Sequence, residues 1–318
     1  MRITLSLIIP IYNAKDFIVE TIQSVLYEIP NNVEVILVND GSTDNSVEII
    51  KQNFASQLTS EQLILIEQTN AGVSVARNTG IEQSKGEYIS FVDADDLLFN
   101  NYYESVFSII NSQSPDIIDI GFRQFSVNAD LSKNPDMFTY NNFGLLNTDD
   151  VISNIFAKSV FYSWARITKR TVLGDLRFPA GVNFCEDMIF LYQLYQQSER
   201  IYHIDKALYA YRDNAAGATR NMKPDYIKSM LMLYNQILND NRPEISYLKI
   251  NVFYVIYRCH CELNKRISIP FAVFIDTKKL AVRSCFDKKI PLRKKMILAI
   301  PNIHRHLVKL KNYCKSRT

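Results

Sequence analysis

Glycine-rich nucleotide-binding motifs are missing from this sequence of 318 residues, which holds only 9 glycines and 10 prolines. No G-x-G-x-x-G follows the first apolar run, and no G-x-x-x-x-G-K-[ST] occurs anywhere in the chain. These absences argue against a dinucleotide-binding fingerprint and against a P-loop phosphate cradle. The chain has no repeats, and 47% of its residues are hydrophobic, which indicates a globular protein of one large domain or two smaller ones.

A long hydrophobic run is also missing. No stretch approaches the roughly 18–20 apolar residues that a membrane-spanning helix needs. The apolar run at residues 5–11 is short, contains Pro10 and lacks a small-residue cleavage site, so we expect no signal peptide and a cytoplasmic protein, soluble or peripheral. The five cysteines are irregularly spaced, which predicts reduced thiols, and Cys259-His260-Cys261 has no second pair at zinc-finger spacing.

Positive charge is concentrated at the C-terminal end. Residues 283–318 hold 11 Lys and Arg against one acidic residue, whereas the rest of the chain holds 25 basic and 32 acidic residues. This pattern predicts an anionic partner, and since no nucleic-acid recognition motif accompanies it, we favour the inner face of the cytoplasmic membrane. The alternative is a helix packed on the rest of the protein with a solvated basic face.

The first hundred residues alternate between apolar runs and helical spacing. Strands are predicted at residues 5–9, 33–38, 63–66 and 88–92, with helices at 13–26, 46–54 and 73–83 between them. Such an order is typical of an α/β fold with a mostly parallel sheet covered by helices on both faces. We predict a catalytic domain at residues 1–222 and a helical C-terminal region with a basic amphipathic tail at 223–318.

Polar residues follow each of these strands. They are Tyr12-Asn13, Asp40-Gly41-Ser42, Asn70-Ala71-Gly72 with Arg77, and Asp93-Ala94-Asp95-Asp96. In open parallel sheets ligands bind beyond the carboxyl ends of the strands, so we expect these groups to form one crevice.

The acidic cluster at residues 93–96 has two interpretations. Three carboxylates this close repel one another, and a divalent cation such as Mn²⁺ or Mg²⁺ would relieve the repulsion and bridge to a diphosphate. Alternatively, Asp95 or Asp96 caps a helix that begins at Leu97.

Four segments, residues 6–13, 38–44, 70–78 and 91–96, resemble the family 2 glycosyltransferases, which are inverting enzymes of the GT-A fold. The resemblance implies a nucleotide-diphospho-sugar donor, usually UDP-linked. It also implies roles for single residues: Pro10, Tyr12 and Asp40 at the nucleobase, Arg77 at the ribose or phosphate, Asp93 and Asp95 at the D-x-D positions beside the ribose and metal, and Asp96 as an additional metal ligand.

Glu186-Asp187 resembles the family's E-D element, whose Asp serves as general base, with Glu186 as the fallback. Taken alone, the pair would favour a different interpretation, an acidic first helical turn that interacts with the helix dipole. Trp164, the only tryptophan, is predicted either as core or as a lining of the acceptor side. The segment containing Arg212 and Arg220 resembles the part of the family that folds over the diphosphate, where either arginine could pair with phosphate oxygens.

We therefore predict a metal-dependent hexosyl- or N-acetylhexosaminyltransferase that acts on a glycan acceptor, possibly lipid-linked, in the synthesis of a surface polysaccharide such as O-antigen, capsule or lipooligosaccharide. One alternative is a sugar-phosphate nucleotidyltransferase, which needs a Gly-rich, basic loop that Pro10-Ile11-Tyr12-Asn13 does not supply. The other is a non-catalytic protein that binds a sugar nucleotide or glycan.

Overall fold

The structure is a computed structural model, and it describes residues 2–126, 131–158, 160–182, 184–213, 223–263 and 269–299. The chain divides into two compact units. The first comprises Met1–Val151 and Phe161–Gly217, and the second comprises Ile152–Val160 and Ala218–Thr318. The second unit thus takes in a short stretch from the middle of the chain, which the sequence did not suggest. Arg220 and the basic residues beyond 299 lie outside the described residues.

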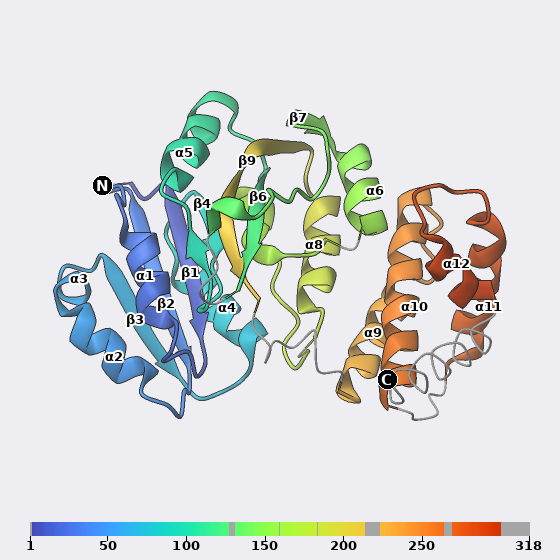
Figure 1. Cartoon of the computed structure of the whole chain (residues 1–318), viewed down its shortest axis with the longest axis horizontal. Coiled ribbons are helices and arrows are strands. Elements are labelled where there is room, and N and C mark those ends of the chain that lie inside the picture. The colour runs from blue at the N-terminus through green and yellow to red at the C-terminus, as the bar shows by residue number, and fades with distance from the viewer. Residues whose placement is uncertain are drawn as a thin grey trace. The chain divides into compact units, whose positions relative to one another are not determined.

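The first unit is built on a nine-stranded sheet within the described residues (Figure 1). Its strands are β1 (Leu5–Ile11), β2 (Val33–Asp40), β3 (Leu63–Gln68), β4 (Tyr88–Phe91), β5 (Leu97–Leu98), β6 (Ile117–Phe125), β7 (Gly144–Asn147), β8 (Arg166–Lys169) and β9 (Arg200–Arg212). The order across the sheet is β3-β2-β1-β4-β8-β6-β9-β5, and β7 pairs with β9.

Its helices are α1 (Ile18–Leu26), α2 (Ser46–Asn53), α3 (Ala55–Thr59), α4 (Val73–Gln83), α5 (Tyr102–Gln113), α7 (Arg170–Leu173) and α8 (Glu186–Gln196), while α6 (Thr148–Lys158) continues into the second unit. The expected helix at 13–26 begins only at Ile18, because Asn13 has a left-handed backbone with φ of 53°. Short 3₁₀ turns occur at Leu131–Lys133 and Ser163–Ala165.

The strands β3, β2, β1 and β4 are parallel, as predicted, and β1 is buried along its whole length. Alternate β1 side chains, such as Leu7 and Ile9, join a core with α1, α2 and α5. On the opposite face, α4 packs so closely that a Cβ added to Gly80 would lie 2.3 Å from Cγ2 of Ile8. The apolar run of β1 thus reflects burial by helices on both faces.

The second half of the sheet differs from the expectation. The antiparallel strand β8 is inserted between β4 and β6, and β9 runs from Arg200 to Arg212. β6 and β9 are parallel, with a register shift near Gly121. The consequence for the site is that residues 209–212, part of the segment expected to fold over the diphosphate, lie in a strand beside β5 and β6.

The second unit is helical in its described part. It contains α9 (Asp225–Ile237), α10 (Pro243–Leu263), α11 (Phe271–Arg283) and α12 (Leu292–Ala299), with buried residues such as Leu233, Leu248 and Ile256 between them. Lys249, only 3% exposed, forms an ion pair of 3.3 Å with Asp276. No helix among the described residues is both long enough and apolar enough to cross a membrane.

Candidate active site

The carboxyl ends of β1 and β2 lie side by side, because the two strands pair in parallel up to Ile11 and Asn39. Asn13, just after β1, accepts a hydrogen bond of 2.8 Å from the backbone N–H of Thr43, and its own N–H donates to Oγ of Ser42. Pro10 is buried within β1, whereas Tyr12 is 53% exposed. An exposed aromatic ring at this edge offers a flat apolar surface against which a nucleobase can stack.

Asp40 ties the end of β2 to the turn before α4. Its carboxylate accepts hydrogen bonds from the N–H groups of Ala71 and Gly72, at 2.9 and 2.8 Å, and from Nε2 of Gln68 at 2.7 Å. Asp40 is only 3% exposed, so its protein partners already use most of its acceptor capacity. A nucleobase N–H would therefore reach Asp40 only by displacing or sharing one of these bonds.

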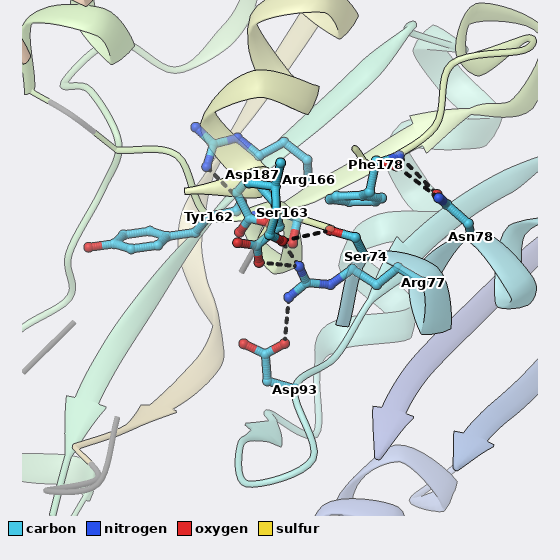
Figure 2. Close-up of polar contacts among 11 residues, drawn as sticks. Ser74, Arg77, Asn78, Asp93, Tyr162, Ser163, Arg166, Phe178 and Asp187 are labelled. Carbon is cyan, nitrogen blue, oxygen red and sulfur yellow. Dashed lines mark hydrogen bonds and ion pairs between the residues drawn. The ribbon is translucent and has the colours of Figure 1, made fainter. Parts of the chain in front are cut away.

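Arg77, on α4, is the centre of the charged group (Figure 2). Its Nη1 lies 2.9 Å from both Oε1 of Glu186 and Oδ1 of Asp187, and its Nη2 lies 3.1 Å from Oδ1 of Asp93. The guanidinium, 5% exposed, also lies over the ring of Phe178 at 5.1 Å. One buried cation thus brings together the predicted D-x-D aspartate and both members of the predicted E-D pair.

The negative charge at this point exceeds what Arg77 neutralises. Burial raises the pKa of Asp93 to about 6, although Arg77 opposes the shift, while Asp187 and Asp95 add to it. Burial and the neighbouring Asp187 likewise raise the pKa of Glu186 to about 7 against the effect of Arg77. Such an excess of carboxylate charge favours an additional cation in the crevice.

Asp187 is held by a second donor besides Arg77. The backbone N–H of Ser163 donates to Oδ2 of Asp187 at 3.1 Å (Figure 2). Asp187 belongs to the first turn of α8, which begins after Cys185 in a left-handed conformation with φ of 56°. Both carboxylate oxygens are therefore fixed in direction, which a group that must receive a proton from a bound substrate requires.

Asp96 has a structural position rather than the open position of a metal ligand. It is fully buried, and its carboxylate accepts hydrogen bonds of 2.7 Å from the hydroxyl of Tyr209 and the N–H of Arg212. The predicted share of Asp96 in a metal site would require a cation to reach a fully buried carboxylate and to use the lone pairs that these two bonds leave. The helix-capping alternative is also wrong, because Leu97 begins β5 and not a helix.

Arg212, predicted as a residue that pairs with phosphate oxygens, is likewise engaged by protein groups. Its Nε donates to the carbonyl of Asp95 at 2.6 Å, its Nη2 pairs with Glu20 at 2.6 Å, and its guanidinium lies near the rings of Phe17 and Phe125. These contacts fix the acidic loop at the end of β4. Arg220 lies outside the described residues, so its predicted contact with phosphate stays a prediction.

Trp164 is packed in an aromatic stack. It is 3% exposed and stacks on Tyr162 and Tyr209, with ring centroids at 4.8 and 4.2 Å. Of the two predictions for Trp164, this placement agrees with a core residue. Contact with an acceptor would require a neighbouring ring to move. The stack connects the turn at Ser163, whose N–H donates to Asp187, with strand β9, whose Tyr209 donates to Asp96.

The residues suit a divalent cation only in part. Among the described residues, no three Asp, Glu, His or Cys side chains converge on a point where they could hold a metal ion. Asp93 and Asp95 supply hard oxygen donors in a region of surplus negative charge, which suits Mn²⁺ or Mg²⁺. Since Mg²⁺ sites commonly use one or two carboxylates plus substrate phosphates, the missing ligands are those that a diphosphate would bring.

Several residues that build the site gave no signal in the sequence. Ser163 acts through its backbone, and Tyr209 and Glu20 bond to partners more than a hundred residues away. Asn78 is a similar case, because its side chain exchanges two hydrogen bonds with the backbone of Phe178 (Figure 2). Asn78 lies inside a segment that resembles the family, but its spacing could not identify Phe178 as its partner.

The sequence pattern described as "Glycosyl transferase family 2" matches residues 6–176, more than half of the chain. The chain belongs to this family. Glycosyltransferase GlyA of Streptococcus pneumoniae is 30% identical over 228 residues, which cover 68% of this chain and 31% of GlyA. The chain thus spans about a third of the length of GlyA.

Solved structures show the same fold at lower identity. S. aureus TarS in complex with UDP-GlcNAc is 19% identical, with a TM-score of 0.66 over 99% of this chain and 92% of that one. A mannosyltransferase from Pyrobaculum calidifontis, in complex with GDP-Man and Mn²⁺, is 16% identical, with a TM-score of 0.56 over 94% of this chain and 86% of that one. The family 2 chain therefore has the GT-A type of α/β fold.

Proposed function

We propose that this family 2 chain is an inverting glycosyltransferase that moves a hexosyl or N-acetylhexosaminyl group from a UDP-linked donor to a hydroxyl of a glycan. The observation that carries the proposal is the position of Arg77, which contacts both Asp93 on the donor side and Asp187 of the E-D pair. The TarS complex with UDP-GlcNAc supports the choice of donor, and the family match argues for transfer rather than nucleotidyl chemistry.

In the proposed reaction, Asp187 takes the proton of the acceptor hydroxyl while the oxygen forms a bond to the anomeric carbon. The bond from that carbon to the diphosphate breaks on the opposite side, which inverts the configuration. Asp187 suits this role because Arg77 and Ser163 orient both of its oxygens. Glu186, whose pKa lies close to neutral, is the alternative base.

Asp93 and Asp95 would hold a Mn²⁺ or Mg²⁺ ion, which neutralises charge on a diphosphate leaving group when bound. Tyr12 would stack on the nucleobase of the donor, and Pro10 and Asp40 would line the same end of the site. The Mn²⁺ in the Pyrobaculum calidifontis mannosyltransferase complex supports this part of the proposal.

Calorimetric titration with UDP tests the donor site. We expect UDP to bind at least about tenfold more tightly in Mn²⁺ than in EDTA, a difference of about 1.4 kcal/mol in binding free energy. Asp95→Asn should remove this difference, whereas Asp205→Asn, at an exposed carboxylate of β9, should keep it. GDP, CDP and dTDP are titrated alongside. If no nucleoside diphosphate binds under either condition, the proposed activity is wrong. Equal binding in Mn²⁺ and in EDTA would contradict the metal dependence but leave the proposed donor site in place.

We also propose a cytoplasmic location with peripheral attachment to anionic membrane, and hence a lipid-linked acceptor in surface polysaccharide synthesis. The support comes from the segment that runs from the end of α11 to the start of α12, where Val282, Phe286 and Leu292 are 78%, 95% and 72% exposed. Arg283, Lys288 and Lys289 lie between them in the sequence, and Arg293 follows directly. Exposed apolar groups among basic ones suit an interface of acyl chains and anionic headgroups.

Vesicle sedimentation tests the membrane proposal. The full chain should sediment with vesicles of phosphatidylcholine and phosphatidylglycerol but not with phosphatidylcholine alone, because both charge and apolar insertion contribute. Phe286→Ser should weaken sedimentation several-fold, while Leu145→Ser, which removes a half-exposed side chain from β7, should not. Equal sedimentation of the two variants would contradict an assignment to this surface.

A further inference from the structure

A buried ion pair lies behind the site, outside the crevice. Arg166 in β8 and Asp119 in β6 are 1% and 0% exposed, with Nε of Arg166 3.0 Å from Oδ1 of Asp119. The hydroxyl of Tyr195 accepts from Nε of Arg166 at 2.9 Å and donates to Asp119 at 3.1 Å. Tyr140 donates to the other Asp119 oxygen at 2.7 Å. A buried pair of this kind is often no more stabilising than apolar packing, so its presence invites a role in positioning.

Arg166 reaches the turn that holds the proposed base. Its Nη1 donates to the carbonyl of Tyr162 at 2.9 Å, and the N–H of the next residue, Ser163, donates to Asp187 (Figure 2). The peptide between Tyr162 and Ser163 is planar and stiff, so fixing its carbonyl also fixes the direction of its N–H. Arg166 is thus separated from Asp187 by one peptide unit.

Tyr195 connects the same pair to the helix that carries the base. It lies in α8, whose first turn holds Asp187, eight residues or about 12 Å earlier along the helix axis. The Arg166–Asp119–Tyr195 cluster therefore contacts the turn whose Ser163 N–H orients Asp187, and through Tyr195 it includes the helix α8 that carries Asp187. A displacement of either by about 1 Å would misalign the carboxylate with an acceptor hydroxyl, an error that commonly lowers rates by about 100-fold.

We infer that Arg166, Asp119 and Tyr195 are positioning residues for Asp187. They touch neither donor nor acceptor, and they act by holding the Ser163 N–H and the start of α8 in fixed relation. The inference rests on the proposed function, because it requires Asp187 to receive the acceptor's proton.

The test measures UDP release from UDP-GlcNAc with a panel of nitrophenyl glycosides as hydroxyl acceptors, together with UDP affinity by calorimetry. Tyr195→Phe deletes one hydroxyl and should lower kcat about tenfold, with KM for UDP-GlcNAc and the Kd for UDP within twofold of wild type. Arg166→Met should lower kcat by about 100-fold, and Arg166→Lys should recover part of the loss. The matched control is Tyr88→Phe, which also removes a buried hydroxyl, bonded to the carbonyl of Pro115, and should leave kcat within twofold.

Wild-type kcat in both Tyr195→Phe and Arg166→Met would overturn the inference. So would parallel losses of kcat and UDP affinity, because these would indicate general damage to the fold. Tyr195→Phe decides the matter if Arg166→Met does not fold. Failure of the proposed function has a different signature, in which wild-type protein releases no UDP or Asp187→Asn keeps the wild-type rate.

Discussion

Replacing Asp187 by asparagine is expected to lower kcat for sugar transfer by about 10²–10⁴-fold, the usual contribution of a general base. The amide keeps the size of the side chain and can still accept a hydrogen bond from Ser163 or Arg77, but it cannot take the acceptor's proton. UDP affinity in Mn²⁺ should stay within a few-fold of wild type, because Asp187 touches the donor-side carboxylate only through Arg77.

Glu186→Gln is the matched control for this experiment. Glu186 precedes Asp187 in the same helical turn and bonds to the same Nη1 of Arg77, so both variants remove one negative charge from the same place. We expect the loss of kcat in Glu186→Gln to be at least about tenfold smaller than in Asp187→Asn. The reverse order would make Glu186 the base, and full activity in Asp187→Asn would favour a non-catalytic sugar-nucleotide-binding protein.

The donor half of the site was predictable because its signals are local. The apolar run of β1, the turn residues after β2 and the acidic cluster after β4 each follow a strand within a few positions. A parallel sheet then brings the strand ends together without further information. Asp40 thus bonds to the turn before α4 and Arg77 to Asp93 after β4, while their roles toward a nucleotide stay predictions.

The surroundings of Asp96 and the second half of the sheet were not predictable, since they depend on hydrogen bonds and strand pairing between distant parts of the chain. Asp96 looks like a metal ligand in the sequence, but Tyr209, 113 residues later, makes it a buried acceptor. The strand that carries Tyr209 and Arg212 pairs with β5 and β6, which lie about a hundred residues earlier in the chain. The inserted strand β8 is only four residues long, too short for periodicity to identify it.

Replacing Arg77 by methionine is expected to lower the free energy of unfolding by about 3 kcal/mol and to abolish measurable transfer, because breaking a buried ion pair leaves charge without a partner. Arg77 is 5% exposed and faces Asp93, Glu186 and Asp187, whose side chains are 13–30% exposed, so the lower end of the usual range applies. Denaturant unfolding in EDTA measures the change. The control is Lys51→Met, which removes an exposed pair with Glu67 and should cost less than about 1 kcal/mol.

The pH dependence of this loss distinguishes charge from packing. Glu186 has a folded-state pKa of about 7, above its ordinary value of 4.5, so the folded state binds more protons and its stability falls as pH rises between these values. Without Arg77, which lowers that pKa, the pKa of Glu186 rises further and the decline extends to higher pH. The deficit of Arg77→Met relative to wild type should therefore be larger at pH 8 than at pH 5. A deficit that does not change with pH would mean that Arg77 stabilises the site through its packing on Phe178 rather than through its charge.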